Sequence, residues 1–125
     1  MTATFEKRTG INRLVFATYY SLRGLCSCVR YESAFRQELV IFLLLLPVVF
    51  MVDFTAIERL ALIGVMVAVM VVEAINSAIE CTLDRISTEL HPLAGRAKDY
   101  GSLAVFMTLL VALATWLVLL WPKFA

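Results

Sequence analysis

Cysteine, glycine and charge are all scarce in this chain. It has three cysteines, an odd number, and the C-x-C pair Cys26 and Cys28 has no second pair to join, which argues against a disulfide framework and against a zinc site. Reduced thiols are therefore expected. The five glycines never form the G-x-x-x-x-G-K loop that cradles phosphates. Because no basic run or interleaved aromatic patch is present, a nucleic-acid partner is not expected.

What the chain has in abundance is apolar sequence. It is 125 residues long, 62% hydrophobic, with a mean hydropathy of +0.88, which a soluble domain of this size could not bury. Long apolar runs predict membrane-spanning helices at about 34–52, 60–86 and 98–121, with a break near Pro92 and Gly95 before the last. Residues 11–30 alternate apolar and basic positions at helical spacing, as in an amphipathic helix at the membrane surface. We therefore expect one all-α integral membrane domain, residues 1–125, with three transmembrane helices and an N-terminal interfacial helix.

The distribution of positive charge predicts the orientation in the membrane. Of the eleven lysines and arginines, only Arg59 and Lys123 lie on the side of the first turn and the C-terminus. The other nine precede the first span or lie between the second and third. The excess predicts a cytoplasmic N-terminus.

A polar stripe interrupts the second apolar run. Its members share one helix face: Glu73, Asn76, Ser77, Glu80 and Asp84. A carboxylate near the bilayer centre costs about 2.5–3.5 kcal/mol, so such groups are rare and usually functional. Glu73 lies fourteen residues from Arg59, about 21 Å along the helix, and Glu80 lies about 10 Å further. The stripe is therefore expected near the cytoplasmic membrane surface.

The residues at this depth suit phosphoryl transfer. Glu32 and Glu80, if helix packing brought them together, would bind Mg²⁺, which accepts one or two carboxylates plus substrate phosphates. Lys98 and Arg13 could neutralise phosphate charge. Glu73, partly shielded from water, could take a proton from a hydroxyl group. Metal, cations and a base are the components that phosphoryl transfer requires.

Several short motifs resemble one known family. They are EAINSAIE at 73–80, DRI at 84–86, GRAKD at 95–99, GS at 101–102, AFRQE at 34–38, and Tyr20-Ser21 with Gly24-Leu25. Together they closely resemble the prokaryotic diacylglycerol kinases, over roughly residues 8 to 124. The resemblance implies a homotrimeric enzyme of the bacterial inner membrane. It would transfer the γ-phosphate of MgATP to diacylglycerol, with composite active sites between neighbouring subunits.

The same resemblance implies roles for individual residues. Glu73 matches the catalytic base and Asn76 an essential polar neighbour, while Glu32 and Glu80 match metal ligands. The positions that match nucleotide contacts are Arg13, Tyr20, Glu32, Glu80, Glu89, Leu90, His91, Lys98 and Asp99. The positions that match lipid contacts are Arg13, Tyr20, Ser21, Ala34, Phe35, Arg36, Gln37, Glu38, Glu73, Ser102 and Trp116.

Three other readings stay open. An undecaprenol kinase of the same family would also present a primary hydroxyl at the interface. A small proton-coupled transporter would also carry an intramembrane glutamate, although three spans and acids gathered at one face count against it. A non-catalytic assembly subunit would not need the acidic and basic residues at one depth. Lipid-dependent ATP turnover separates the kinases from the other two.

Overall fold

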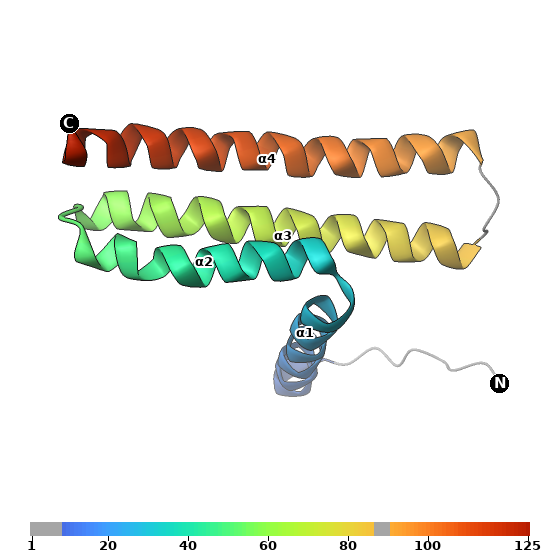
Figure 1. Cartoon of the computed structure of the whole chain (residues 1–125). Coiled ribbons are helices and arrows are strands. Elements are labelled where there is room, and N and C mark those ends of the chain that lie inside the picture. The colour runs from blue at the N-terminus through green and yellow to red at the C-terminus, as the bar shows by residue number, and fades with distance from the viewer. Residues whose placement is uncertain (1–8, 87–90) are drawn as a thin grey trace.

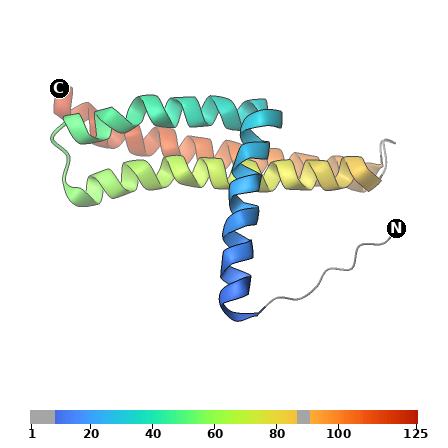
Figure 2. The same cartoon turned by 90° about the horizontal axis from the view of Figure 1, so that it is seen from below.

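The chain forms four helices, three of which lie side by side. The computed structural model describes residues 9–86 and 91–125. The helices are α1 (Gly10–Tyr31), α2 (Ser33–Met51), α3 (Ala56–Ile86) and α4 (Pro92–Phe124). Helices α2, α3 and α4 run antiparallel as a bundle, and α1 points away from it (Figure 1; Figure 2). Each bundle helix is long and apolar enough to cross a membrane, which confirms the three predicted spans.

Helix α3 is the centre of the bundle and packs against both α2 and α4. Its buried apolar residues Leu62, Met66 and Val69 recur every three or four positions and so form one face. That face meets Val49 of α2 and Trp116 of α4 in the hydrophobic core. Leu62 and Val49 have no exposed surface, so this half of the bundle is tightly packed. The same face of α3 continues beyond Val69 as the polar stripe.

The turn between α2 and α3 is held by reciprocal hydrogen bonds. The Thr55 backbone N–H donates to Glu58 Oε1 (2.9 Å) and the Glu58 N–H donates to Thr55 Oγ1 (3.2 Å), a capping box that starts the helix at Ala56. The predicted start at residue 60 was therefore wrong, because the local cap extends the helix past the apolar run. Arg59 Nε donates to the carbonyl of Val49 (3.0 Å), one of the unpaired carbonyls at the end of α2.

Helix α4 begins earlier than the sequence suggested. Pro92 occupies its first turn, and His91 Nδ1 accepts a hydrogen bond from the Leu93 N–H (3.1 Å). Proline is well suited to a first helical turn, since its missing N–H would have no partner there. The predicted start at 98 and the predicted break at Gly95 were therefore wrong, and Gly95 lies inside the helix.

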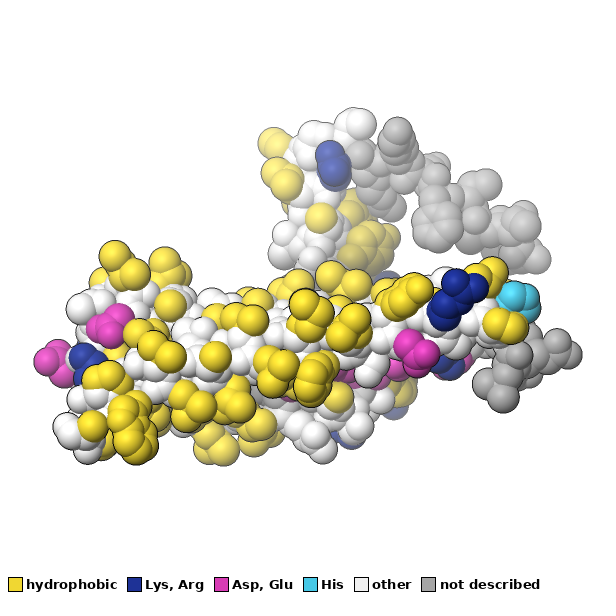
Figure 3. Space-filling view, turned by 90° about the horizontal axis from the view of Figure 1, so that it is seen from above, with side chains coloured by type: hydrophobic (Ala, Val, Ile, Leu, Met, Phe, Trp, Pro, Cys, Tyr) yellow, Lys and Arg dark blue, Asp and Glu magenta, His cyan; other side chains and the backbone are white. Residues whose placement is uncertain are grey.

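The surface of the bundle matches a membrane environment. In the space-filling view, hydrophobic side chains cover its middle, and charged side chains gather toward its two ends (Figure 3). At one end a single residue, Glu32, separates α1 from α2. Arg36 Nη1 donates to the carbonyls of Val29 (3.0 Å) and Arg30 (2.9 Å), which ties the end of α1 to the first turn of α2.

Candidate functional site

The first three residues of the polar stripe of α3 are buried inside the protein. Glu73, Asn76 and Ser77 have 7%, 8% and 5% of their surface exposed and are the buried polar side chains among residues 9–86 and 91–125. They lie on the face of α3 that packs in the bundle, so these groups do not face lipid. The physical cost of burying a carboxyl group in a small bundle points to a functional reason for keeping it.

Asn76 connects the buried and the exposed parts of the stripe. Its Nδ2 donates to Glu80 Oε1 (3.3 Å), one helical turn further along α3. Within the described residues, Asn76 Oδ1 and Ser77 Oγ are buried without a hydrogen-bond partner. Buried polar atoms are almost always paired, so two neighbouring unpaired ones on one helix face are unusual.

Glu32 and Glu80 are the candidate cation ligands near Glu73. Glu32 lines a cavity together with Ser77 of α3, so helix packing has brought Glu32 to this end of α3. Neither Glu32 nor Glu80 forms an ion pair within the described part of the chain. Two unpaired carboxylates supply the hard oxygen ligands that Mg²⁺ prefers, with phosphate and water oxygens completing its shell. The described residues contain no group of three acidic, histidine or cysteine side chains that could hold a metal ion by themselves, so a cation at Glu32 and Glu80 would take its remaining ligands from phosphate and water.

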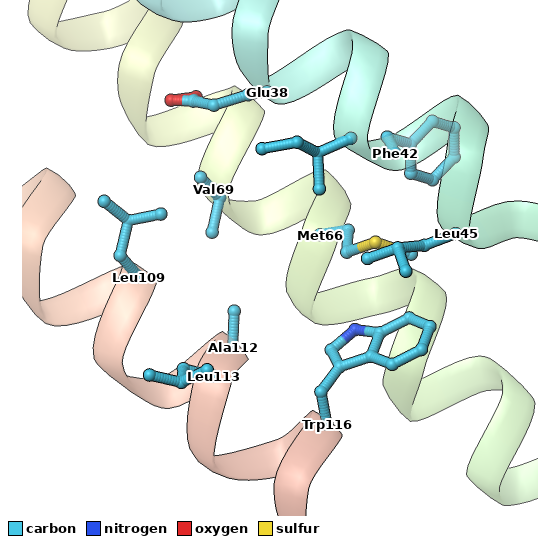
Figure 4. Close-up of a pocket in the computed structure, with 10 residues that line it drawn as sticks. Glu38, Phe42, Leu45, Met66, Val69, Leu109, Ala112, Leu113 and Trp116 are labelled. Atoms are coloured by element: carbon cyan, nitrogen blue, oxygen red, sulfur yellow. The ribbon is translucent and has the colours of Figure 1, made fainter. Parts of the chain in front are cut away.

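An apolar groove leads to this cluster. It is a cavity of about 360 Å³ between α2 and α4, floored by Met66 and Val69 of α3. Figure 4 shows Glu38 at one end of it and Trp116 at the other. Apolar side chains line the rest: Ile41, Phe42, Leu45, Leu109, Ala112 and Leu113. The charge of Glu73 acts on Glu38, so the polar end of the groove is the end near the stripe.

A second cavity, of about 550 Å³, separates α1 from α3. It brings together Ser21, Glu32 and Phe35, which the resemblance assigned to metal and substrate, with the buried Ser77. Cys28 and Cys81 face the same space from opposite helices. Burial raises the pKa of the Cys28 thiol, and the negative charge of Glu32 nearby adds to the effect. The polar stripe therefore lies between two cavities.

Other residues implied by the resemblance lie apart from Glu73 in this chain. Arg13 and Tyr20 are exposed on α1, which extends away from the bundle (Figure 2). Arg36 holds the α1–α2 junction, and the side chains of Ala34 and Gln37 are exposed beside it. A site that used Arg13 and Glu73 together would need two chains.

The first turns of α4 carry a second set of these residues. Lys98 Nζ forms an ion pair with Asp84 Oδ1 at 2.9 Å, with 45% and 66% of the two side chains exposed. The remaining described members, His91, Asp99 and Ser102, are exposed. Glu89 and Leu90 lie outside the described residues. Lys98 is thus fixed near the end of the stripe through Asp84.

Comparison with known proteins agrees with the motifs. Residues 19–120 match the family described as prokaryotic diacylglycerol kinase. The chain belongs to this family. A protein named diacylglycerol kinase from Escherichia coli (strain K12) is 47% identical over 116 residues, which cover 93% of this chain and 95% of that protein. Proteins with the same name from Pseudomonas aeruginosa and Haemophilus influenzae are 45% and 44% identical, covering 93% and 88% of this chain and 94% and 93% of their own lengths. The resemblance read from the motifs is confirmed.

For this member of the prokaryotic diacylglycerol kinase family, the structure adds residues to which sequence reasoning gave no role. Ser77 was part of the stripe, and the structure adds that its hydroxyl group is buried without a hydrogen-bond partner among the described residues. Asp84 pairs with Lys98 across fourteen residues of sequence. Gly101 packs against Asn76; the sequence placed it in the GS motif at 101–102 but gave it no role.

Proposed function

We propose that the protein is an ATP-dependent lipid kinase that transfers the γ-phosphate of ATP to the hydroxyl group of diacylglycerol, forming phosphatidate. The observation that carries this proposal is the buried Glu73 carboxyl group beside an apolar groove whose polar end is Glu38. A proton-accepting group that adjoins a lipid-sized apolar space suits a substrate with a hydroxyl head and hydrocarbon tails. The family membership supports the same chemistry.

In this proposal Glu73 is the general base. The lipid hydroxyl oxygen forms a bond to the γ-phosphorus, the bond from that phosphorus to the bridging oxygen of ADP breaks, and the hydroxyl proton passes to Glu73. Asn76, with its unpaired Oδ1, orients the reacting groups. A hydrocarbon chain lies in the groove toward Trp116, with Glu38 and Ser102 near its head. Exclusion of water by the apolar lining favours transfer to lipid over hydrolysis.

Glu32 and Glu80 would hold the magnesium ion. That ion, when bound, neutralises charge on the transferred phosphate. The exposed first turns of α4, with His91, Lys98 and Asp99, would contact the nucleotide, together with Glu89 and Leu90. Because the Asp84 partner of Lys98 is exposed, phosphate oxygens can compete for the ammonium group.

The arrangement of the chain supports a homotrimer in the bacterial inner membrane, with the N-terminus in the cytoplasm. Arg85 lies in the last turn of α3, and Arg96 and Lys98 lie near the start of α4, which favours this end of the bundle as the cytoplasmic one. Helix α1 would lie on the membrane surface there. Since Arg13 and Tyr20 are exposed on α1, and α1 extends away from the bundle (Figure 2), they are proposed to complete the site of a neighbouring subunit.

The deciding experiment measures ADP release by purified protein in mixed micelles with MgATP and one of three additions: dioleoylglycerol, undecaprenol or no acceptor. Turnover chiefly on dioleoylglycerol supports the proposal. Turnover chiefly on undecaprenol would move the protein to the prenol branch. If an intact, folded oligomer shows no acceptor-dependent turnover, the kinase proposal fails and a transporter or an assembly subunit replaces it.

A further inference from the structure

One contact between α3 and α4 depends on a missing side chain. Gly101 is buried in α4, opposite Asn76 of α3. A Cβ atom placed on Gly101 would overlap Asn76 Oδ1 and would lie 3.0 Å from Asn76 Cγ. The glycine therefore leaves the space that the Asn76 amide occupies. At other glycines inside helices, such as Gly95 and Gly64, an added Cβ would have no neighbouring atom within 4 Å.

The amide of Asn76 has one orientation in this space. Its Nδ2 donates to Glu80 Oε1 at 3.3 Å, so the oxygen must point the other way, toward Gly101. If the amide were reversed, its oxygen would face the Glu80 carboxylate oxygen and repel it. The bare backbone of Gly101 and the carboxylate of Glu80 thus fix the two ends of the amide.

A second contact near Gly101 joins the same faces of α3 and α4. Lys98, three residues before Gly101 and so close to it on one helix face, pairs with Asp84 of α3 at 2.9 Å. Asp84 in turn lies eight residues beyond Asn76 on the stripe. Both contacts place the Gly101 side of α4 against α3.

We propose that Gly101 is a positioning residue: its lack of a side chain holds the Asn76 amide in the orientation that bonds Glu80. This inference rests on the proposed function, in which Asn76 and Glu80 serve phosphoryl transfer. A methyl group at position 101 meets the far end of a side chain rather than backbone, so the amide rotates away and the helices stay packed. Displacement of a catalytic group by about 1 Å can lower turnover about a hundredfold.

The first test is a double-mutant cycle on kcat with MgATP and dioleoylglycerol in mixed micelles. Gly101→Ala is expected to lower kcat about a hundredfold. In an Asn76→Ala background the same substitution should lower kcat by less than about threefold, because the amide it displaces is gone. If Gly101→Ala lowers kcat by the same factor in the wild-type and the Asn76→Ala backgrounds, the proposal is wrong. Gly64→Ala, at an exposed glycine of α3 with nothing within 4 Å of a Cβ, is the matched control and should keep normal turnover.

A second test does not depend on catalysis. The chain has two asparagines, Asn12 and Asn76, so ¹⁵N-asparagine labelling gives two side-chain amide signals, and Asn76→Ala assigns them. Gly101→Ala should shift the Asn76 signal and Gly64→Ala should not; an unmoved Asn76 signal in Gly101→Ala would refute the positioning role. If the wild type phosphorylates no lipid while the shift is seen, the proposed function fails and the contact stands.

Folding of the variants supplies a further criterion. If Gly101→Ala alone does not fold, the Asn76→Ala/Gly101→Ala double variant must fold, because the obstructing amide is absent. A double variant that also fails to fold would show that Gly101 serves helix packing in general, and the proposal would be wrong.

Discussion

Replacing Glu73 by glutamine separates its role in the reaction from its role in the fold. Glutamine has the shape of glutamate but cannot accept the hydroxyl proton. Loss of a general base lowers turnover by roughly 10²–10⁴-fold, which corresponds to about 2.7–5.5 kcal/mol of transition-state stabilisation. The side chain is only 7% exposed and has no hydrogen bond or ion pair within the described residues, while the charges of Glu80 and Glu32 act on it. A neutral amide removes that repulsion, so the free energy of unfolding should stay equal or rise by up to about 2 kcal/mol.

The assay is kcat and KM for MgATP in mixed micelles, together with unfolding by a denaturing detergent. Turnover should collapse while KM for MgATP changes little, since glutamine leaves Glu32 and Glu80 in place. Glu58→Gln is the matched control: it makes the same change on the same helix, at the outer turn, and should keep activity within about twofold. A Glu73→Gln protein that retains more than about a tenth of wild-type kcat would refute the assignment of the base.

Three further predictions follow from the contacts around the site. Glu80→Gln should raise the Mg²⁺ concentration needed for half-maximal turnover about tenfold or more, measured by metal titration, because a carboxylate ligand is lost. Leu62→Ala, at a position with no exposed surface, should lower the free energy of unfolding by about 2–5 kcal/mol in a detergent titration, with kcat per folded protein unchanged. The raised pKa of Cys28 leaves less thiolate near neutral pH, so its alkylation in a variant with Cys28 as sole cysteine should stay slow until the pH exceeds the ordinary value of 9.0. Fast labelling of Cys28 at pH 7, followed by mass spectrometry, would contradict its burial.

Much of the bundle could be predicted because the responsible forces are local or periodic. The length of the apolar runs was enough to predict three membrane spans. The helical spacing of Glu73, Asn76 and Ser77 was enough to predict that they share one face, and the structure shows that this face is buried. The ends of helices were less predictable. Hydropathy predicts the end of a helix where charged residues begin. Helix α4 instead begins where the His91 side chain accepts a hydrogen bond from the first turn and Pro92 occupies that turn.

Contacts between helices could not be predicted from spacing along one helix. Asp84 and Lys98 are fourteen residues apart and meet only because α3 and α4 are antiparallel. The Gly101–Asn76 contact and the groove between Glu38 and Trp116 likewise depend on the rotation of each helix about its axis. The packing of all three bundle helices decides that rotation, and no single segment encodes it.

The central position of α3 has a consequence for how the protein is made. When α2 and α3 have left the ribosome and α4 has not, the face that carries Glu73 and Asn76 lacks its α4 cover. On the insertion scale a carboxylate exposed to hydrocarbon costs about 2.5–3.5 kcal/mol. The hairpin of α2 and α3 alone is therefore less stable in the membrane than the complete bundle, and the buried polar residues favour the addition of α4. A nascent chain that ends before residue 92 should be the form that membrane quality control recognises and removes.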